Sequence, residues 1–125
     1  MHIDLYHGYY GLTLRIATGS RNTLTNLKNI FAGLSGGSIK KYSFTSVDYL
    51  RVTGCDAIIV SVKNTPGEYL GIQKSPLRIE VFWQNDSSGW SRVVDLIDGL
   101  LRGGKGHQYL EDCSEELVIE LSYRE

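Results

Sequence analysis

The segment from residue 86 to residue 123 constrains the fold more than any other part of the chain. In its first half, apolar residues recur at the i, i+3, i+4 and i+7 spacing of one helical face: Trp90, Val93, Val94, Ile97, Leu100 and Leu101. Residues 85–88 carry side-chain oxygens that can cap the first turn, and Gly103 and Gly104 allow the helix to end. Apolar residues then alternate at period two: Leu117, Ile119, Leu121 and Tyr123. The chain is therefore predicted to close with a helix followed by a strand that buries one face.

A second helix is predicted nearer the N-terminus. Its apolar face is formed by five residues at helical spacing: Leu24, Leu27, Ile30, Phe31 and Leu34. Three residues could cap its first turn: Ser20, Asn22 or Thr23. Gly36 and Gly37 permit the left-handed backbone that ends many helices.

Strands are predicted around these helices, with turn and loop sequence over residues 63–76. The expected strands cover residues 2–6, 12–18, 39–44, 47–52, 56–62, 77–84 and 117–123. Right-handed crossovers then predict an α+β fold: a two-layer sandwich of one mostly antiparallel sheet with two helices on one face. Residues 1–125 are expected to form a single α+β domain, because a chain of this size removes roughly two-thirds of its unfolded surface from water.

Composition narrows the setting in which the chain works. Its longest apolar runs are far shorter than the ~20 residues of a membrane span, and its polar start lacks a basic region followed by an apolar one. Cys55 and Cys113 are too few for a disulfide framework. We therefore expect a cytoplasmic protein with no membrane partner.

Acidic residues gather near the C-terminus although the net charge is only -1. They are Glu111, Asp112, Glu115, Glu116, Glu120 and Glu125. One interpretation is a solvated turn and strand edge, and the other is a negative patch that steers a basic partner. Both argue against direct nucleic-acid binding, which needs clustered Lys and Arg.

Catalytic chemistry has little support in the sequence. Cys55 or Cys113 could be activated by His107, but Cys55 adjoins an apolar strand and Cys113 sits among carboxylates that would raise its pKa. The glycine-rich residues 103–107 close a helix, whereas a phosphate-binding loop must open one. The chain is thus predicted not to be an enzyme.

Metal binding is the remaining cofactor hypothesis. His2, Asp4 and His7 could contribute ligands from one strand, but His7 falls on the opposite face from the other two. Two ligands do not make a zinc site, and no cofactor is predicted.

Tyrosines are the strongest indication of binding. Tyr6, Tyr9 and Tyr10 fall in one predicted hairpin, and Tyr109 follows the second helix. Tyrosine offers a large amphipathic surface at a small cost in rotamer entropy, as protein interfaces require. This aromatic set favours a protein-binding module.

The chain resembles small bacterial immunity proteins of polymorphic toxin systems, from about Leu12 to the C-terminus. The resemblance lies in a strand running into Thr18-Gly19-Ser20, a leucine-rich helix, then a second helix followed by the sequence GHQYLE at 106–111 and a strand at 116–121. His107, Leu110 and Glu111 match its short motif, whereas Tyr109 stands where a second histidine is expected.

The resemblance implies a non-enzymatic protein that binds and neutralises a cognate toxin domain, often a nuclease. The expected partner-binding residues are Glu111, Asp112, Glu115, Glu116, Tyr9, Tyr10, Tyr109 and His107. The alternative is a small enzyme or ligand-binding domain of unknown substrate, which should contain a deep pocket with convergent polar groups.

Overall fold

A computed structural model describes residues 1–111 and 117–125 of the chain. The described part contains both α-helices and β-strands, as predicted for an α+β protein. In chain order they are β1 (His2–Gly8), β2 (Gly11–Thr18), α1 (Arg21–Gly36), β3 (Lys41–Phe44), β4 (Arg51–Thr53), β5 (Ala57–Val62), β6 (Tyr69–Ser75), β7 (Arg78–Asn85), α2 (Ser87–Gly103), β8 (Gly106–Tyr109) and β9 (Val118–Tyr123).

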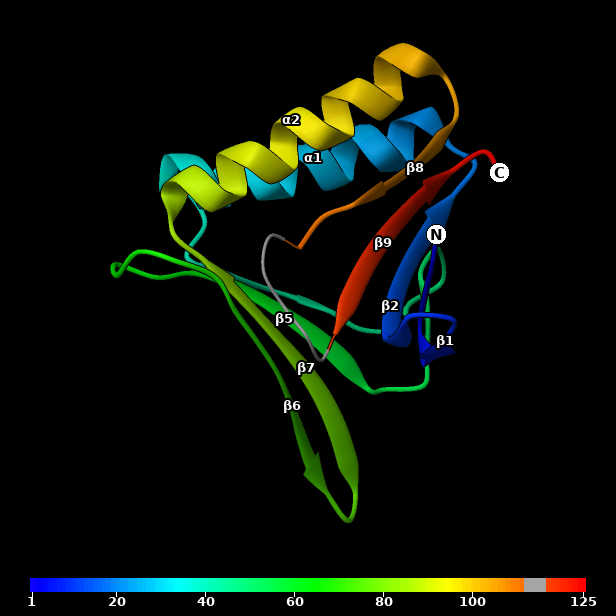
Figure 1. The fold of residues 1–125 in the computed structure, drawn as a ribbon, viewed down its shortest axis with the longest axis vertical. Coiled ribbons are helices and arrows are strands. Elements are labelled where there is room, and N and C mark those ends of the chain that lie inside the picture. Colours follow the sequence, from blue (N-terminus) through cyan, green and yellow to red (C-terminus); the bar gives the residue numbers. More distant parts are fainter. Residues whose placement is uncertain (112–116) are drawn as a thin grey trace.

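The strands form two mixed sheets. One has five strands in the order β4-β1-β2-β9-β8, and the other has four in the order β3-β5-β7-β6. Parallel pairing occurs between β1 and β4, between β2 and β9, and between β5 and β7. In Figure 1 the two helices lie side by side across the top, and the β6–β7 hairpin extends away from them. The prediction of a single sheet is therefore wrong, and antiparallel pairing accounts for four of the seven strand pairs among the described residues.

Between β4 and β5 the chain passes from one sheet to the other at a glycine. β4 pairs with β1 in the five-stranded sheet, whereas β5 pairs with β3 and β7 in the other sheet. Gly54 lies between them with φ of 80°, and a Cβ there would collide with the carbonyl oxygen of Leu5. Asp56 then fixes the start of β5, because its backbone N–H donates to the Ile79 carbonyl at 2.8 Å and its carboxylate accepts from the Ile79 N–H at 2.7 Å.

Both helices begin and end as their sequences indicate. Ser20, one of three candidate caps, accepts a hydrogen bond from the Thr23 N–H at 3.2 Å, and Asp86 accepts one from Gly89 at 2.8 Å. Left-handed Gly37 and Gly104 end the two helices. Among the described residues, no helix has both the length and the apolar character needed to traverse a lipid bilayer.

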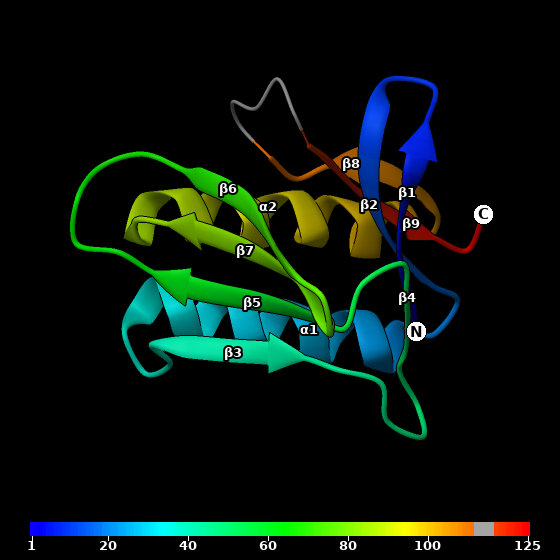
Figure 2. The same ribbon diagram turned by 90° about the horizontal axis from the view of Figure 1, so that it is seen from below.

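The apolar faces predicted from periodicity form the core. Leu24, Leu27, Phe31 and Leu34 of α1 are buried, as are Trp90, Val93, Ile97, Leu100 and Leu101 of α2. Ile30 and Val94 lie at the flanks of these faces and are partly buried. The alternating residues of the last strand are also buried: Leu117, Ile119, Leu121 and Tyr123. Figure 2 shows the two helices behind the four-stranded sheet when the molecule is seen from below.

Four strand predictions need correction. Residues 69–75, expected to be loop, form β6, since a polar edge strand of this kind has no clear apolar alternation. β8 was not predicted as a separate strand. Residues 47–52 do not form one strand: Val47 and Leu50 form an isolated bridge, and only Arg51–Thr53 joins a sheet. The strand expected over residues 77–84 begins one residue later, and Leu77 lies in the β6–β7 turn, where it is 95% exposed.

Replacement of Ile97 by alanine tests the packing of α2. Ile97 is fully buried, so Ile97→Ala should lower the free energy of unfolding by ~2–5 kcal/mol through lost burial and the cavity left behind. Leu77→Ala is the matched control, and we expect a change within about 0.5 kcal/mol because its side chain is exposed. Chemical denaturation measures both values. Equal losses at the two positions would contradict the packing of α2 described above.

Candidate functional site

The five-stranded sheet has one face in the core and one polar face. Ile3, Leu14 and Leu121 point into the core from three neighbouring strands. Residues alternate across a strand, so their sequence neighbours face away from the core. A row of such residues crosses four strands in register: Asp4, Arg15, Glu120 and Tyr109.

Tyrosines from two distant parts of the sequence meet at one end of this sheet. Tyr10, from the β1–β2 turn, and Tyr109, at the end of β8, line a shallow hollow of about 330 Å³ together with Glu111 and Val118. The Tyr9 ring lies edge-on to the Tyr10 ring, with 5.0 Å between centroids. Tyr9, Tyr10 and Tyr109 are 95%, 73% and 43% exposed. Tyr9, Tyr10, Tyr109 and Glu111 are called the tyrosine–acid surface below.

The tyrosine–acid surface contains four of the eight residues predicted to bind a partner. Asp112, Glu115 and Glu116 lie outside the described residues, so Glu111 is the one predicted partner-binding acid that the structure describes. Burial raises the pKa of the Glu111 carboxyl, and backbone N–H groups of Glu111 and Ile119 oppose that shift. Its Oε2 atom is buried and has no hydrogen-bond partner among the described residues. Glu111 is therefore less available to an incoming cation than a fully solvated carboxylate.

The surroundings of Tyr109 favour its neutral phenol. Desolvation raises the pKa of its phenol, and the nearby Glu120 carboxylate and Tyr10 hydroxyl raise it further. A neutral phenol keeps its hydrogen and can donate it to a partner. The tyrosine–acid surface thus presents aromatic rings with hydrogen-bond donors.

His107, the remaining predicted residue, is engaged within the chain. Its Nδ1 lies 3.1 Å from Glu125 Oε2, and the other oxygen of Glu125 accepts a hydrogen bond from the Ser122 hydroxyl at 3.0 Å. Arg15 in turn donates to the Ser122 hydroxyl at 3.2 Å. The hydrogen bond to Glu125 raises the pKa of His107, and the same contact lowers the pKa of Glu125.

The contact between His107 and Glu125 should make the stability of the fold depend on pH. The raised pKa of His107 means that its contribution to stability is complete below the ordinary value of 6.5 and disappears as pH rises through the raised value. The lowered pKa of Glu125 means that its contribution is present above 4.5 and disappears as pH falls through the lowered value. The pair therefore stabilises the fold most between those two limits.

An NMR titration of the His107 ring carbons tests this pair. Glu125→Gln should lower the midpoint of the His107 titration, because the amide cannot stabilise the imidazolium as a carboxylate does. Glu120→Gln is the matched control and should lower the midpoint by less, since Glu120 is a smaller contributor to the shift. An unchanged midpoint in the Glu125 variant would show that the contact does not form in solution.

His2 and Asp4, which were considered as metal ligands, are joined by a threonine. The Thr53 hydroxyl donates to Asp4 Oδ1 at 2.7 Å and lies 2.8 Å from His2 Nε2. Because that hydroxyl has only one hydrogen, His2 Nε2 must donate to it. Within the described ranges, no three His, Cys, Asp or Glu side chains are grouped so that they could hold a metal ion.

Cys55 is unsuited to nucleophilic chemistry. Desolvation, followed by the charges of Asp56 and Asp4, raises the pKa of its thiol to about 11. A thiol with this pKa is almost fully protonated at neutral pH, and the thiolate is the reactive form. Cys113, the other candidate, lies outside the described residues.

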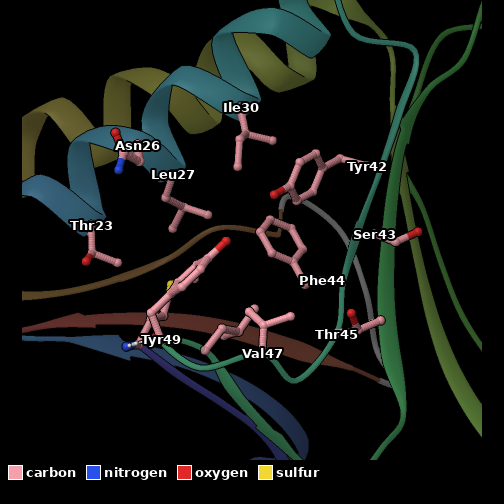
Figure 3. A pocket seen from close by; sticks show the side chains of 12 residues that line it. Thr23, Asn26, Leu27, Ile30, Tyr42, Ser43, Phe44, Thr45, Val47 and Tyr49 are labelled. Atoms are coloured by element: carbon pink, nitrogen blue, oxygen red, sulfur yellow. Dashed lines mark hydrogen bonds between the residues drawn. The ribbon is translucent and has the colours of Figure 1, made fainter.

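A further hollow involves none of the predicted site residues. It lies between α1, β3 and residues 45–50 and has a volume of about 350 Å³ (Figure 3). We call it the α1 pocket, and its apolar wall consists of Leu27, Ile30, Tyr42, Phe44, Val47 and Tyr49. Residues 39–44 and 47–52 were both expected to form strands, and that expectation gave no indication of a pocket between them and α1. The exposed aromatic residues at 42 and 49 were the available signal.

Comparison with family models, curated proteins and solved structures found no match for this chain.

Proposed function

We propose that the chain is a non-enzymatic immunity protein that binds and neutralises a cognate bacterial toxin domain, possibly a nuclease. It would act in the cytoplasm, without a cofactor and without direct contact to nucleic acid or membrane. The observation that carries this proposal is the convergence of Tyr10, Tyr109 and Glu111 on one exposed hollow. The sequence resemblance to immunity proteins supports the same function.

The exposed rings support a role in protein binding. Large aromatic side chains that remain exposed leave apolar surface in water, which a partner can cover. Tyrosines are enriched among the few residues that dominate binding energy at protein interfaces. Tyr9 and Tyr10 stand at a hairpin tip, and Tyr109 lies beside them, so one partner surface can contact all three.

The acidic segment supports the choice of a basic partner. A nuclease binds a polyanion and therefore has a positive cleft. Carboxylates at residues 111–116 would attract such a cleft and accelerate association. In this proposal the tyrosines provide affinity, and the acidic residues increase the association rate and favour a basic partner.

Protection from toxicity is the direct test. The toxin domain encoded beside this gene is expressed from an inducible promoter, with and without the chain, and survival is counted. We expect survival only in the presence of the chain, together with a stable complex of the two purified proteins. Failure to protect and to form a complex would contradict the proposal.

The aromatic contribution has its own test. The double change Tyr10→Ala with Tyr109→Ala should raise the dissociation constant for the toxin domain by about 30-fold or more, the effect of losing a hot spot of ~2 kcal/mol. Tyr69→Ala is the matched control, because Tyr69 is 53% exposed on β6 and does not line this hollow. Isothermal titration calorimetry measures both. Similar losses in the two variants would place the interface elsewhere.

The acidic contribution is tested by kinetics. Replacing Glu111, Asp112, Glu115 and Glu116 by Gln and Asn should slow association and flatten its dependence on salt, because steering depends on long-range charge. The thermal midpoint should stay nearly unchanged. Stopped-flow measurements at several salt concentrations give the association rate. If the association rate of the variant depends on salt as before, these four residues belong to a solvated edge and not to the interface.

A further inference from the structure

The α1 pocket has the composition of a small-molecule site. Leu27 and Ile30 of α1 form one wall, and the Phe44 ring and Val47 form another. Figure 3 shows the hydroxyl groups of Tyr42 and Tyr49 turned toward the middle of the hollow from two sides. Its volume of about 350 Å³ lies at the lower end of the roughly 300–1,000 Å³ typical of ligand sites, which suits a ligand of one or two rings.

The outer wall of the pocket is held in place without a ligand. Val47 and Leu50 exchange backbone hydrogen bonds in both directions, at 2.9 and 3.0 Å. The Ser46 hydroxyl accepts from the Val52 N–H at 2.9 Å and donates to the Val52 carbonyl at 3.3 Å. Residues 46–52 therefore form a tied loop that presents the Tyr49 ring to the pocket. A preformed wall lowers the ordering cost of binding.

This loop leaves apolar surface in water. Tyr49 is 75% exposed and Val47 is 50% exposed, although both lie next to the apolar wall of the pocket. The Tyr42 ring packs on the buried Phe44 ring with 4.9 Å between centroids and is itself 36% exposed. A ligand in the hollow would cover Val47, Tyr49 and the exposed part of Tyr42 and remove their apolar area from water.

The side chains that line the pocket favour an uncharged ligand. Among the described residues that line it, none has an ionisable Lys, Arg, His, Asp or Glu side chain, and the ammonium group of Met1, which also lines it, already donates to the Tyr49 carbonyl at 3.0 Å. An ion entering the pocket would lose water without gaining a counter-charge from a side chain. The hydroxyl groups of Tyr42 and Tyr49, which face the hollow in Figure 3, can each donate or accept a hydrogen bond.

We propose that the α1 pocket binds a small, uncharged, planar aromatic molecule that carries hydrogen-bonding substituents. The aromatic and aliphatic walls hold its ring, and the hydroxyl groups bind its polar edge. The site is separate from the tyrosine–acid surface: the pocket lies beside β3 and the loop that leads into β4, and β4 and β8 are opposite edges of the five-stranded sheet. The proposal does not rest on the proposed function.

Three matched probes test the proposal in the full chain. Benzamide is flat, neutral and able to donate and accept hydrogen bonds; benzoate has the same shape with a negative charge; cyclohexanecarboxamide keeps the amide on a ring that is not flat. Binding is followed by shifts of backbone amide signals during titration. We expect saturable shifts of residues in α1 and 42–50 with benzamide, with a dissociation constant on the order of millimolar. The other two probes should bind at least about tenfold more weakly, a difference of ~1.4 kcal/mol.

Variants at Tyr49 connect binding to the pocket. Tyr49→Ala should weaken benzamide binding at least about fivefold, and Tyr49→Phe should weaken it less because only the hydroxyl is lost. Tyr69→Ala, which removes an exposed tyrosine outside the pocket, should leave binding unchanged. Tyr49 is largely exposed, so these variants should remain folded, and the amide spectrum reports that directly. The proposal is overturned if benzamide gives no saturable shifts, if its shifts centre outside the pocket, if benzoate binds equally well, or if Tyr49→Ala binds as tightly as the original chain.

Discussion

Three aromatic rings hold the two helices onto the four-stranded sheet. Phe31 of α1 stacks on Trp90 of α2 at 5.2 Å, and Trp83 of β7 meets both rings edge-on at 5.5 and 4.8 Å. The indole N–H of Trp90 donates to the Ser61 carbonyl at 3.0 Å, and that of Trp83 donates to Glu68 at 3.1 Å. The rings therefore bury a large apolar area without leaving an indole donor unsatisfied. The positions of α1 and of everything built against it depend on this contact.

The same architecture separates two surfaces that differ in chemistry. Once α1 is fixed, its exposed flank forms a wall of the α1 pocket, near the β4 edge of the five-stranded sheet. The insertion of β9 between β2 and β8 brings the β1–β2 turn close to the end of β8 and creates the tyrosine–acid surface. Each surface is formed by segments far apart in the chain. Two binding activities can therefore be present in one small chain without competing for the same residues.

Hydrogen bonding within the chain also distinguishes polar groups that support the fold from groups that can contact a partner. Arg15, Ser122, Glu125 and His107 are connected by hydrogen bonds across the outer face of the five-stranded sheet. His2, Thr53 and Asp4 are connected in the same way near its other edge. Because these polar groups already have partners, a new contact to them would have to replace an existing one. The exposed tyrosine rings carry no such cost, which makes them the better anchors for binding.

The sequence alone was sufficient for features that depend on neighbouring residues: both helices, the segments that contain their caps, the buried face of the last strand and the α+β class. Helical spacing and capping act over three or four residues, so their signals are local. The division into two sheets, the edge strand β6, the meeting of Tyr10 with Tyr109 and the α1 pocket were decided by tertiary structure. Strand pairing satisfies backbone groups whose donors and acceptors are the same in every residue, so side-chain periodicity cannot specify which strands become neighbours.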